Sequence, residues 1–440
     1  MIIRSFCCRY RAAAILFSAM LFATPGRAAN WLLLQGTEPA GAAPRAKLWG
    51  FVQPEFQQTD GTALAAGPWK GQAAIFNRIG PDLKSETTFQ IRRARIGVRG
   101  TGMPLDGKVN YFVLAEMGNN GITRQGGGSV RLTDASITLN HIPGARIRIG
   151  QFKYPGSEEG LQAIHVFDYI NFTNASNILL LERFFDGDGS DKQDPNRPNG
   201  AIGAFRDVGI QLFDSFRRGP WEHSYAVMVG NGNGIDRADD DANKDLYLYW
   251  SSERIYGGKG PRRQGLKLSA WMQDGKRTLT KAGSGEYDRR RWGAGFTFRK
   301  NRWRAAGEYI AADGMIFNGS DGGAVPGAKN NAGTAVASFN VAPHGEADGW
   351  YLHAGYAVTP KWELDLRYDV LNRLTDSATG ERKFETVTLG AQYFFNKKSR
   401  LIVNYERRDA EAPGVAASAP PNTILDGIDD RLSIQFLAIF

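Results

Sequence analysis

In three segments of the chain, arginines recur at every second position. The positions between them are mostly apolar. In residues 88–101, Arg93, Arg95 and Arg99 alternate with Ala94, Ile96 and Val98. Successive side chains of an extended strand point to opposite faces, so these arginines share one face. The pattern recurs with Arg146 and Arg148 in residues 145–153, and with Arg289, Arg291 and Arg299 in residues 289–300. A row of guanidinium groups facing water attracts anions, because each is a fixed positive charge with several hydrogen-bond donors.

The apolar face of these strands predicts which way the cations point. An arginine that faces lipid at mid-membrane costs about 2–4 kcal/mol, so the apolar face meets lipid and the arginines meet water. The predicted pore-lining, anion-binding residues are Arg93, Arg95, Arg99, Arg146, Arg148, Lys153, Lys267, Arg289, Arg291 and Arg367. Lys153 has the opposite parity to Arg148, so its inward position requires a local bulge or rests on the resemblance described below. Arg92 also breaks parity and predicts a bulge or a position near a rim.

A structural role competes with the transport role for each of these cations. Enclosed arginines commonly pair with carboxylates and so brace the wall. The acidic residues that could serve as partners are Glu116, Asp134, Glu308, Glu363, Asp365 and Asp369. For any single arginine the two roles are equally supported, whereas the collective excess of cations favours transport.

Alternation of apolar and polar residues extends along the chain and ends at Phe440. It predicts about 16 strands, at residues 47–57, 88–101, 107–117, 130–141, 145–153, 206–213, 221–230, 245–254, 265–273, 289–300, 303–311, 349–358, 362–371, 384–395, 400–408 and 431–440. Short turn-like links alternate with long polar loops such as 58–86 and 312–348. Strands with one lipid face and one wet face must close on themselves, because an open sheet edge is not tolerated in a bilayer. The expected fold is all-β, a transmembrane antiparallel β-barrel.

The longest loop, residues 154–205, carries an apolar and helix-compatible stretch at 177–185. An apolar stretch inside a polar loop has to be buried, and the nearest place is the inner wall of the barrel. This third long loop is therefore predicted to fold into the lumen. Coverage of a neighbouring subunit is the alternative.

The first residues are typical of an export signal. Arg4, Arg9 and Arg11 precede an apolar stretch too short to span a membrane, and Gly26 to Ala28 supply small residues for cleavage. The predicted organisation is a signal peptide at 1–28, a short N-terminal segment at 29–46 and a barrel at 47–440. Removing the four arginines of the signal from the formal charge of +9 leaves +5, which does not indicate nucleic-acid binding. Both cysteines, Cys7 and Cys8, lie in the signal.

Several other chemistries find no support. The five histidines lack a metal-ligand spacing, and no Gly-x-Ser-x-Gly elbow is present, so neither a metal site nor an enzyme is expected. Residues 186–191 are similar to a calcium loop but lack the full ligand series, so a solvated acidic loop is the alternative to calcium there. No other cofactor is expected. Trp49, Trp221, Trp292, Trp350 and Trp362 are predicted to lie in aromatic girdles or on the lipid face.

The chain resembles the phosphate-selective porins of Gram-negative outer membranes, the O and P type. The residues that carry the resemblance are 89–100 (FQIRRARIGVRG), 149–155 (IGQFKYP) and the terminal Phe440. The resemblance covers residue 47 to the end. It implies a sixteen-stranded and usually trimeric outer-membrane barrel, an inward third loop, a path lined by arginine and lysine, and recognition of the last strand by the assembly machinery. The loop departs from a tight phosphate site, since it carries Glu158, Glu159, His165 and Asp168 where cations should converge.

Three functions follow as hypotheses. The first is a porin that passes small anions by diffusion through an arginine-lined channel, with phosphate-type solutes among them. The second is a general or carbohydrate-type diffusion porin in which the arginines only brace the wall. The third is a barrel adhesin that acts through its long loops. The expected partners are small anionic solutes, outer-membrane lipid, the barrel assembly machinery and two further copies of the chain.

Overall fold

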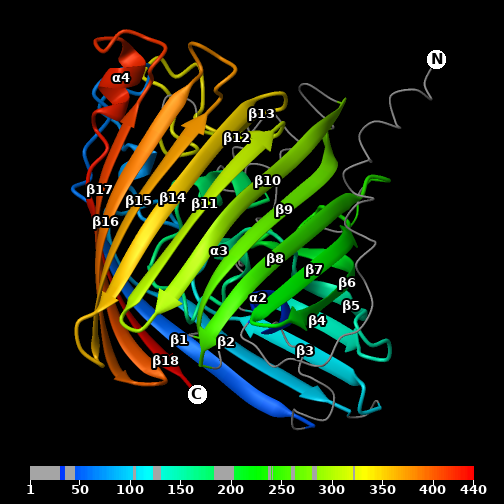
Figure 1. The fold of residues 1–440 in the computed structure, drawn as a ribbon. Helices are drawn as coiled ribbons and strands as arrows, with labels where there is room; N and C mark the ends of the chain where they lie inside the picture. Colours follow the sequence, from blue (N-terminus) through cyan, green and yellow to red (C-terminus); the bar gives the residue numbers. More distant parts are fainter. Residues whose placement is uncertain are drawn as a thin grey trace, which may run out of the picture.

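The computed structural model describes residues 30–34, 45–102, 106–121, 130–182, 203–235, 239, 241–258, 263–279, 285–320 and 323–440. Sixteen antiparallel strands form a closed barrel, and β1 pairs with β18 to complete the ring (Figure 1). The barrel strands are β1 (Lys47–Gln58), β2 (Thr87–Thr101), β3 (Val109–Glu116), β4 (Arg131–Leu139), β5 (Arg146–Lys153), β6 (Arg206–Arg218), β7 (Trp221–Gly230), β8 (Asp245–Gly257), β9 (Gln264–Leu279), β10 (Gly285–Lys300), β11 (Trp303–Asp313), β14 (Glu346–Ala357), β15 (Trp362–Arg373), β16 (Arg382–Asn396), β17 (Ser399–Glu411) and β18 (Arg431–Ile439). The predicted fold class and strand number are confirmed.

Smaller elements belong to the connections. They are the helices α2 (Trp31–Leu34), α3 (Glu158–Leu161) and α4 (Pro420–Leu425), the single turns η1 (Ile75–Asn77) and η2 (Ser176–Leu180), and the hairpin β12 (Ile316–Ser320) with β13 (Phe339–Ala342). The hairpin and α4 lie in segments predicted to be loops. Among the described helices, none has the length and apolar character needed to cross a membrane. The predicted signal peptide and the loop at 186–191 lie outside the described residues.

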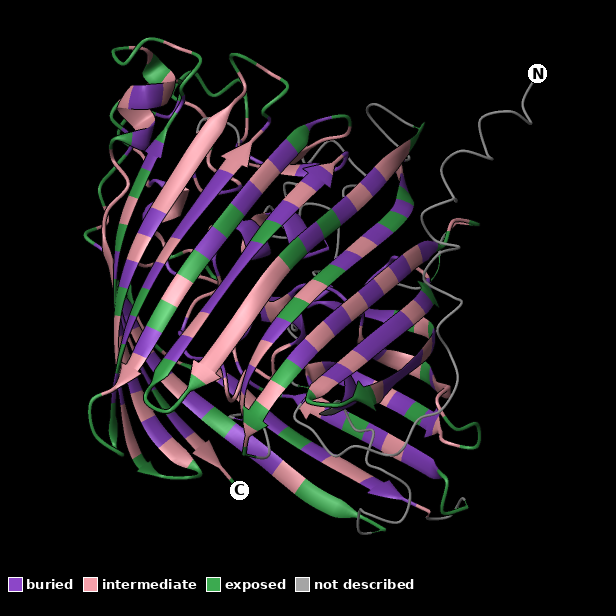
Figure 2. Ribbon diagram, in the orientation of Figure 1, coloured by how far each residue is buried: buried purple, intermediate pink, exposed green. Residues whose placement is uncertain are grey.

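The two faces of the wall follow the predicted alternation (Figure 2). Ile96, Ile149 and Leu366 are exposed on the outer face, where lipid would cover them. Arg95 and Arg148, their strand neighbours of opposite parity, are buried on the inner face. Trp49 does not lie in the outer girdle as predicted: it stacks on Phe51 and Phe112 inside the barrel.

The bulge predicted at Arg92 is present. The β1–β2 ladder pairs Gln53 with Arg93 but Pro54 with Ile91, so Arg92 is the extra residue. An extra residue resets the two-residue period of the strand. The bulge therefore changes which face the odd-numbered residues occupy. Arg93, Arg95 and Arg99, which follow the bulge, share one face, whereas Phe89 and Ile91, which precede it, lie on the outer face.

The last residue completes the closure of the barrel. The amide of Phe440 donates to the carbonyl of Gly50 at 3.0 Å, and the amide of Gly50 donates back at 3.3 Å. A Cβ at position 50 would lie 2.3 Å from Cζ of Phe440. Only glycine leaves room for the ring at this point of the seam.

Candidate functional site: the charged lumen

The long loop after β5 crosses the barrel interior and binds the opposite wall, as predicted for the third loop. The amide of Ile170 donates to Oδ1 of Asn404 on β17 at 2.8 Å. Both amide groups of Asn174 donate to Oδ1 of Asp369 on β15 at 2.9 Å. These partners lie about 200 residues away in the chain, so only the closed barrel brings them to the loop.

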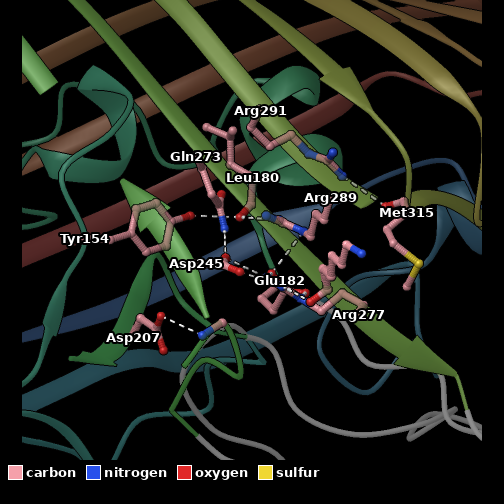
Figure 3. A network of polar contacts seen from close by, with 12 residues as sticks. Tyr154, Leu180, Glu182, Asp207, Asp245, Gln273, Arg277, Arg289, Arg291 and Met315 are labelled. Atoms are coloured by element: carbon pink, nitrogen blue, oxygen red, sulfur yellow. Dashed lines mark hydrogen bonds and ion pairs between the residues drawn. The ribbon is translucent and has the colours of Figure 1, made fainter. Parts of the chain in front are cut away.

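The predicted apolar stretch of the loop is held against β8, β9 and β10 (Figure 3). Glu182 accepts from Arg277 at 2.9 Å and pairs with Arg289 at 3.0 Å. Arg277 also pairs with Asp245 at 2.8 Å. Leu179, Leu180 and Leu181, in and just after η2, are buried in the main apolar cluster. The apolar stretch thus packs on the inner wall, and its charged end is neutralised there.

Arg291 holds the same part of the loop through backbone oxygens. Its Nε donates to Leu179 O at 2.7 Å, and its Nη2 donates to Met315 O at 3.0 Å (Figure 3). Nη1 donates to Gly314 O at 2.9 Å. The guanidinium therefore joins η2 of the loop to the start of the β12–β13 hairpin, which is a positioning role.

Arg304 on β11 is a heavily paired cation of the inner wall. Its three nitrogens contact Asp168 of the loop, Glu363 and Asp365. Its side chain is 3% exposed. One guanidinium thus bridges two wall carboxylates and ties the middle of the loop to them.

Arg367 on β15, like Arg304, lies close to three carboxylates of the loop and the wall. It lies 3.6 Å from Glu159, 3.7 Å from Asp369 and 3.9 Å from Glu406, and its Nη1 donates to Asn171 O at 3.0 Å. Its guanidinium carbon is 4.4 Å from the ring centroid of Tyr169. Carboxylates are at least as numerous as cations on this side of the lumen.

The wall formed by β2, β5 and β6 differs in charge. Arg93, Arg95, Lys153 and Arg206 lie within electrostatic range of one another and of three carboxylates, Glu55, Glu116 and Asp134. Arg95 pairs with Glu116 at 2.8 Å, and Arg206 pairs with Asp134 at 2.9 Å. Arg93 donates to Oε1 of Gln53 at 3.2 Å, and Lys153 donates to Gly160 O and Gln162 O at 2.7 and 2.8 Å. We call these four cations the cationic cluster.

The remaining predicted residues are dispersed. Arg146 pairs with Asp214 at 3.3 Å, and Lys267 pairs with Glu158 of the loop. Arg148 is fully buried between the rings of Phe152 and Phe213. Arg99 is partly buried, and its charge reaches His165. The ten predicted cations therefore do not form one continuous ladder in the described part of the chain. Lys153, Lys267, Arg289 and Arg291 hold the loop, and Arg367 does so together with its acids. Arg93 and Arg95 belong to the cationic cluster, as does Lys153.

Sequence reasoning missed several charged residues of the lumen, among them Arg206, Arg277, Arg304 and Arg400. The alternation could have identified Arg304 as an inward residue, because it lies on the same face of its strand as Glu308. Arg277 shares the parity of Lys267 but lies beyond the predicted end of its strand. Arg206 and Arg400 stand at strand ends, where alternation has too few positions to be read.

His165 of the loop lies between the cationic cluster and the aromatic side chains of Trp49 and Phe51. Its ring centroid is 5.6 Å from that of Trp49 and 5.3 Å from that of Phe51. Burial, and then the positive charges of Arg400, Arg95, Lys153 and Arg99, lower the pKa of His165 to about 3 from 6.5. The imidazole is therefore neutral in the folded protein at ordinary pH.

We expect this lowered pKa to make the folded barrel lose stability as the pH falls below 6.5. In that range the unfolded chain binds a proton at His165 and the folded chain does not, so stability falls by at most about 1.4 kcal/mol per pH unit. Replacing His165→Gln removes the titration. Urea unfolding in detergent at about pH 7.5 and about pH 5 should show a smaller acid-induced decrease in the variant than in the unaltered protein. His344→Gln, at an exposed loop position, is the control, and an equal decrease in both variants would contradict the expectation.

A cavity lies beneath the loop. It is lined by Glu158, Phe167 and Tyr169 of the loop, by Lys267, Arg299, Arg304, Tyr351 and His353 of the wall, and by Trp31 of α2. The hydroxyl of Tyr169 and Nδ1 of His353 are buried without a hydrogen-bond partner among the described residues. The charged residues around it are largely paired, so the cavity offers aromatic faces and a few free polar atoms.

Comparison with known proteins agrees with this architecture. The model of the family described as phosphate-selective porin O and P matches residues 272–421. Among solved structures, the chain is similar to the outer membrane channel DcaP of Acinetobacter baumannii, with 14% identity and a TM-score of 0.52 over 90% of this chain and 97% of that one. The anion-selective porin from Comamonas acidovorans gives 14% identity and a TM-score of 0.52 over 90% and 99%. OmpT of Vibrio cholerae in its trimer form gives 11% and 0.50 over 90% and 99%. No curated protein matches.

The closed sixteen-stranded barrel with an inward loop is the fold class of the outer-membrane porins to which the chain is similar. Within this class, the match to the phosphate-selective porin O and P model confirms the predicted resemblance over residues 272–421. The solved structures, at 14% identity or less, support the fold alone.

Proposed function

We propose that this porin passes small anions by diffusion, with phosphate-type solutes among them, and that it works as a homotrimer. The observation that carries the proposal is the cationic cluster, where four cations share three carboxylates. On the β11–β17 side the carboxylates outnumber the cations around Arg304 and Arg367, each of which lies near three of them. An unequal distribution of charge lowers the electrostatic barrier for anions along one wall.

The contacts of the cluster favour conduction over tight binding. Arg93 is held by one amide oxygen, and Lys153 by two backbone oxygens, and neither has a carboxylate in ion-pair contact among the described residues. Conduction requires binding weak enough to release the ion. A dispersed set of cations meets this condition better than a converging one, which supports a general anion preference with phosphate as one solute.

The first test is the reversal potential of the purified protein in a planar bilayer under a potassium chloride gradient. We expect a sign that corresponds to chloride preference, reduced at high salt because screening weakens the cluster. A clear preference for potassium would overturn the proposal. The same recording with added phosphate should show block, if phosphate-type anions enter the path.

A second candidate is a carbohydrate-type or general porin, and the cavity beneath the loop favours it. Aromatic faces beside paired charges suit polyhydroxylated solutes better than free anions. Block by oligosaccharides without block by phosphate would support this candidate. Block by phosphate without block by oligosaccharides would support the anion channel.

Two further partners belong to the same proposal. The apolar outer face would contact outer-membrane lipid, and the last strand with its terminal Phe440 would be recognised by the barrel assembly machinery. The support for both is the exposed apolar band and the position of Phe440 at the seam of the barrel.

A further inference from the structure

The short helix α2 lies inside the barrel, although it precedes the first strand. Leu32 and Leu33 are 1% and 6% exposed. They belong to the main apolar cluster together with Phe152, Phe213, Ala226, Met228 and Tyr249 of the inner wall of β5–β8. An apolar inner wall is unexpected in a water-filled lumen, where inward residues are usually polar. Here the N-terminal segment covers it.

Polar contacts hold the segment as well. Nδ2 of Asn30 donates to Oγ of Ser224, and Oδ1 of Asn30 accepts from the amide of Leu32 at 3.1 Å. Nη2 of Arg148 donates to Leu32 O at 3.2 Å. A cation at the last carbonyls of a helix is favourable, and it satisfies a group that has no partner within the helix.

Arg148 makes this contact specific. Its side chain is fully buried, and its guanidinium carbon lies 5.1 Å and 4.6 Å from the ring centroids of Phe152 and Phe213. Within the described part of the chain, its only hydrogen-bond acceptor is Leu32 O, since Nε and Nη1 have no partner. Undocking of the segment would leave a buried cation without an acceptor, or admit water to it.

The position of the segment is near the rim of short turns. Ser224 and Arg148 lie two or three residues inside the strands that begin after the turns at 219–220 and 142–145. β1 begins at Lys47 on the same rim, because Lys47 pairs with Arg99 near the β2–β3 turn. In outer-membrane barrels the short turns face the periplasm. Trp31 then lines the cavity beneath the loop from the periplasmic side.

We propose that residues 30–34 are an intramolecular plug. They occupy a receptor site on the inner wall of β5–β8 and narrow the periplasmic vestibule below the long loop. Undocking of the plug enlarges the conducting path. The plug is independent of ion selectivity, so it can be tested whether or not the channel prefers anions.

The first experiment weakens docking without adding charge. Leu32→Asn with Leu33→Asn removes the apolar contacts, and Ile142→Asn with Val358→Asn makes the same change at two exposed positions of the short-turn rim. We expect the first pair to raise single-channel conductance by about twofold or more and the control pair to leave it unchanged, since conductance follows the narrowest open section. Unchanged conductance in a folded Leu32/Leu33 variant would overturn the plug.

The second experiment locks the segment. Asn30→Cys with Ser224→Cys joins two side chains that are in contact, and the native Cys7 and Cys8 lie in the predicted signal peptide. Oxidation should hold conductance at its low value without larger openings, and reduction should restore the behaviour of the unaltered protein. N-terminal mass analysis verifies that the signal is absent.

A third measurement tests docking itself. A single Leu33→Cys should react with a bulky maleimide at least about tenfold more slowly than Lys398→Cys on an exposed turn, because burial protects the thiol. Equal rates would show that the segment is not docked, and would overturn the proposal. The reversal potential recorded in the same bilayers reports separately on the proposed anion preference.

Discussion

Replacing Arg304→Met is expected to lower the free energy of unfolding of the barrel by about 3–5 kcal/mol, because the substitution leaves buried carboxylates without their partner. Arg304 contacts Asp168, Glu363 and Asp365, whose side chains are 10%, 6% and 0% exposed. Met preserves the length and apolar stem of the side chain and removes only the guanidinium. Urea unfolding in detergent, followed by intrinsic fluorescence, measures the change.

The same wall provides a matched control. Arg290, on the outer face of β10, also pairs with three carboxylates, Asp274, Asp288 and Asp313, at 3.2, 2.5 and 3.3 Å. Its side chain is 39% exposed. Exposed ion pairs contribute about 0–1 kcal/mol, so Arg290→Met should change stability by no more than this. Equal effects of the two substitutions would mean that burial does not determine the strength of the Arg304 contacts.

Arg304→Met should also alter conduction. Asp168 is the loop residue of the network, and it would then repel Glu363 and Asp365 instead of sharing a cation with them. We expect the middle of the loop to leave the wall, with noisier single-channel currents. Quiet currents at the original amplitude would place the restraint on the loop elsewhere, for instance at Arg367 or Arg291.

The second large effect concerns selectivity. Arg93→Gln combined with Lys153→Gln removes the two charges of the cationic cluster that lack a carboxylate in contact, while glutamine can still donate to the oxygens of Gln53 and the loop. A unit charge at about 4 Å is worth about 1 kcal/mol even in bulk water. The ratio of anion to cation permeability should therefore fall by about tenfold, as measured by the reversal potential in a salt gradient.

Removal of a charge outside the lumen separates this effect from a change in total charge. Arg302→Gln alters an exposed cation of the β10–β11 turn and should leave the permeability ratio unchanged. A double variant that keeps its original ratio would assign the cluster a bracing role, and would favour the carbohydrate-type alternative.

The barrel could be predicted from the sequence because lipid and water impose a strict period of two. Ser433 and Gln435 face inward while Phe436 faces outward, as the alternation requires. Prediction failed at the strand ends that join the long loops. β9 continues to Leu279 and β10 begins at Gly285, but residues there are polar on both faces, so the ladder extends without a readable pattern.

The contacts of the lumen could be predicted only in part. Parity indicated that arginines face inward, but the partners of Arg304 lie 59 to 136 residues away and depend on the closed barrel and the path of the loop. Trp49 was placed wrongly because its aromatic character was weighed above its parity with Gln53, which faces inward. α2 gave no signal, since four residues are too few to show helical periodicity.

The seam between Gly50 and Phe440 joins the two ends of the folded sheet, so the cylinder is closed only when β1 and β18 pair. The backbone groups of β1 that face the seam stay unsatisfied until β18 and Phe440 pair with them. A chain that lacks the last residues of β18 would form most of the barrel but leave unpaired backbone groups of β1 exposed to hydrocarbon. Sealing of the cylinder therefore depends on the pairing of β1 with β18, two strands at opposite ends of the sequence.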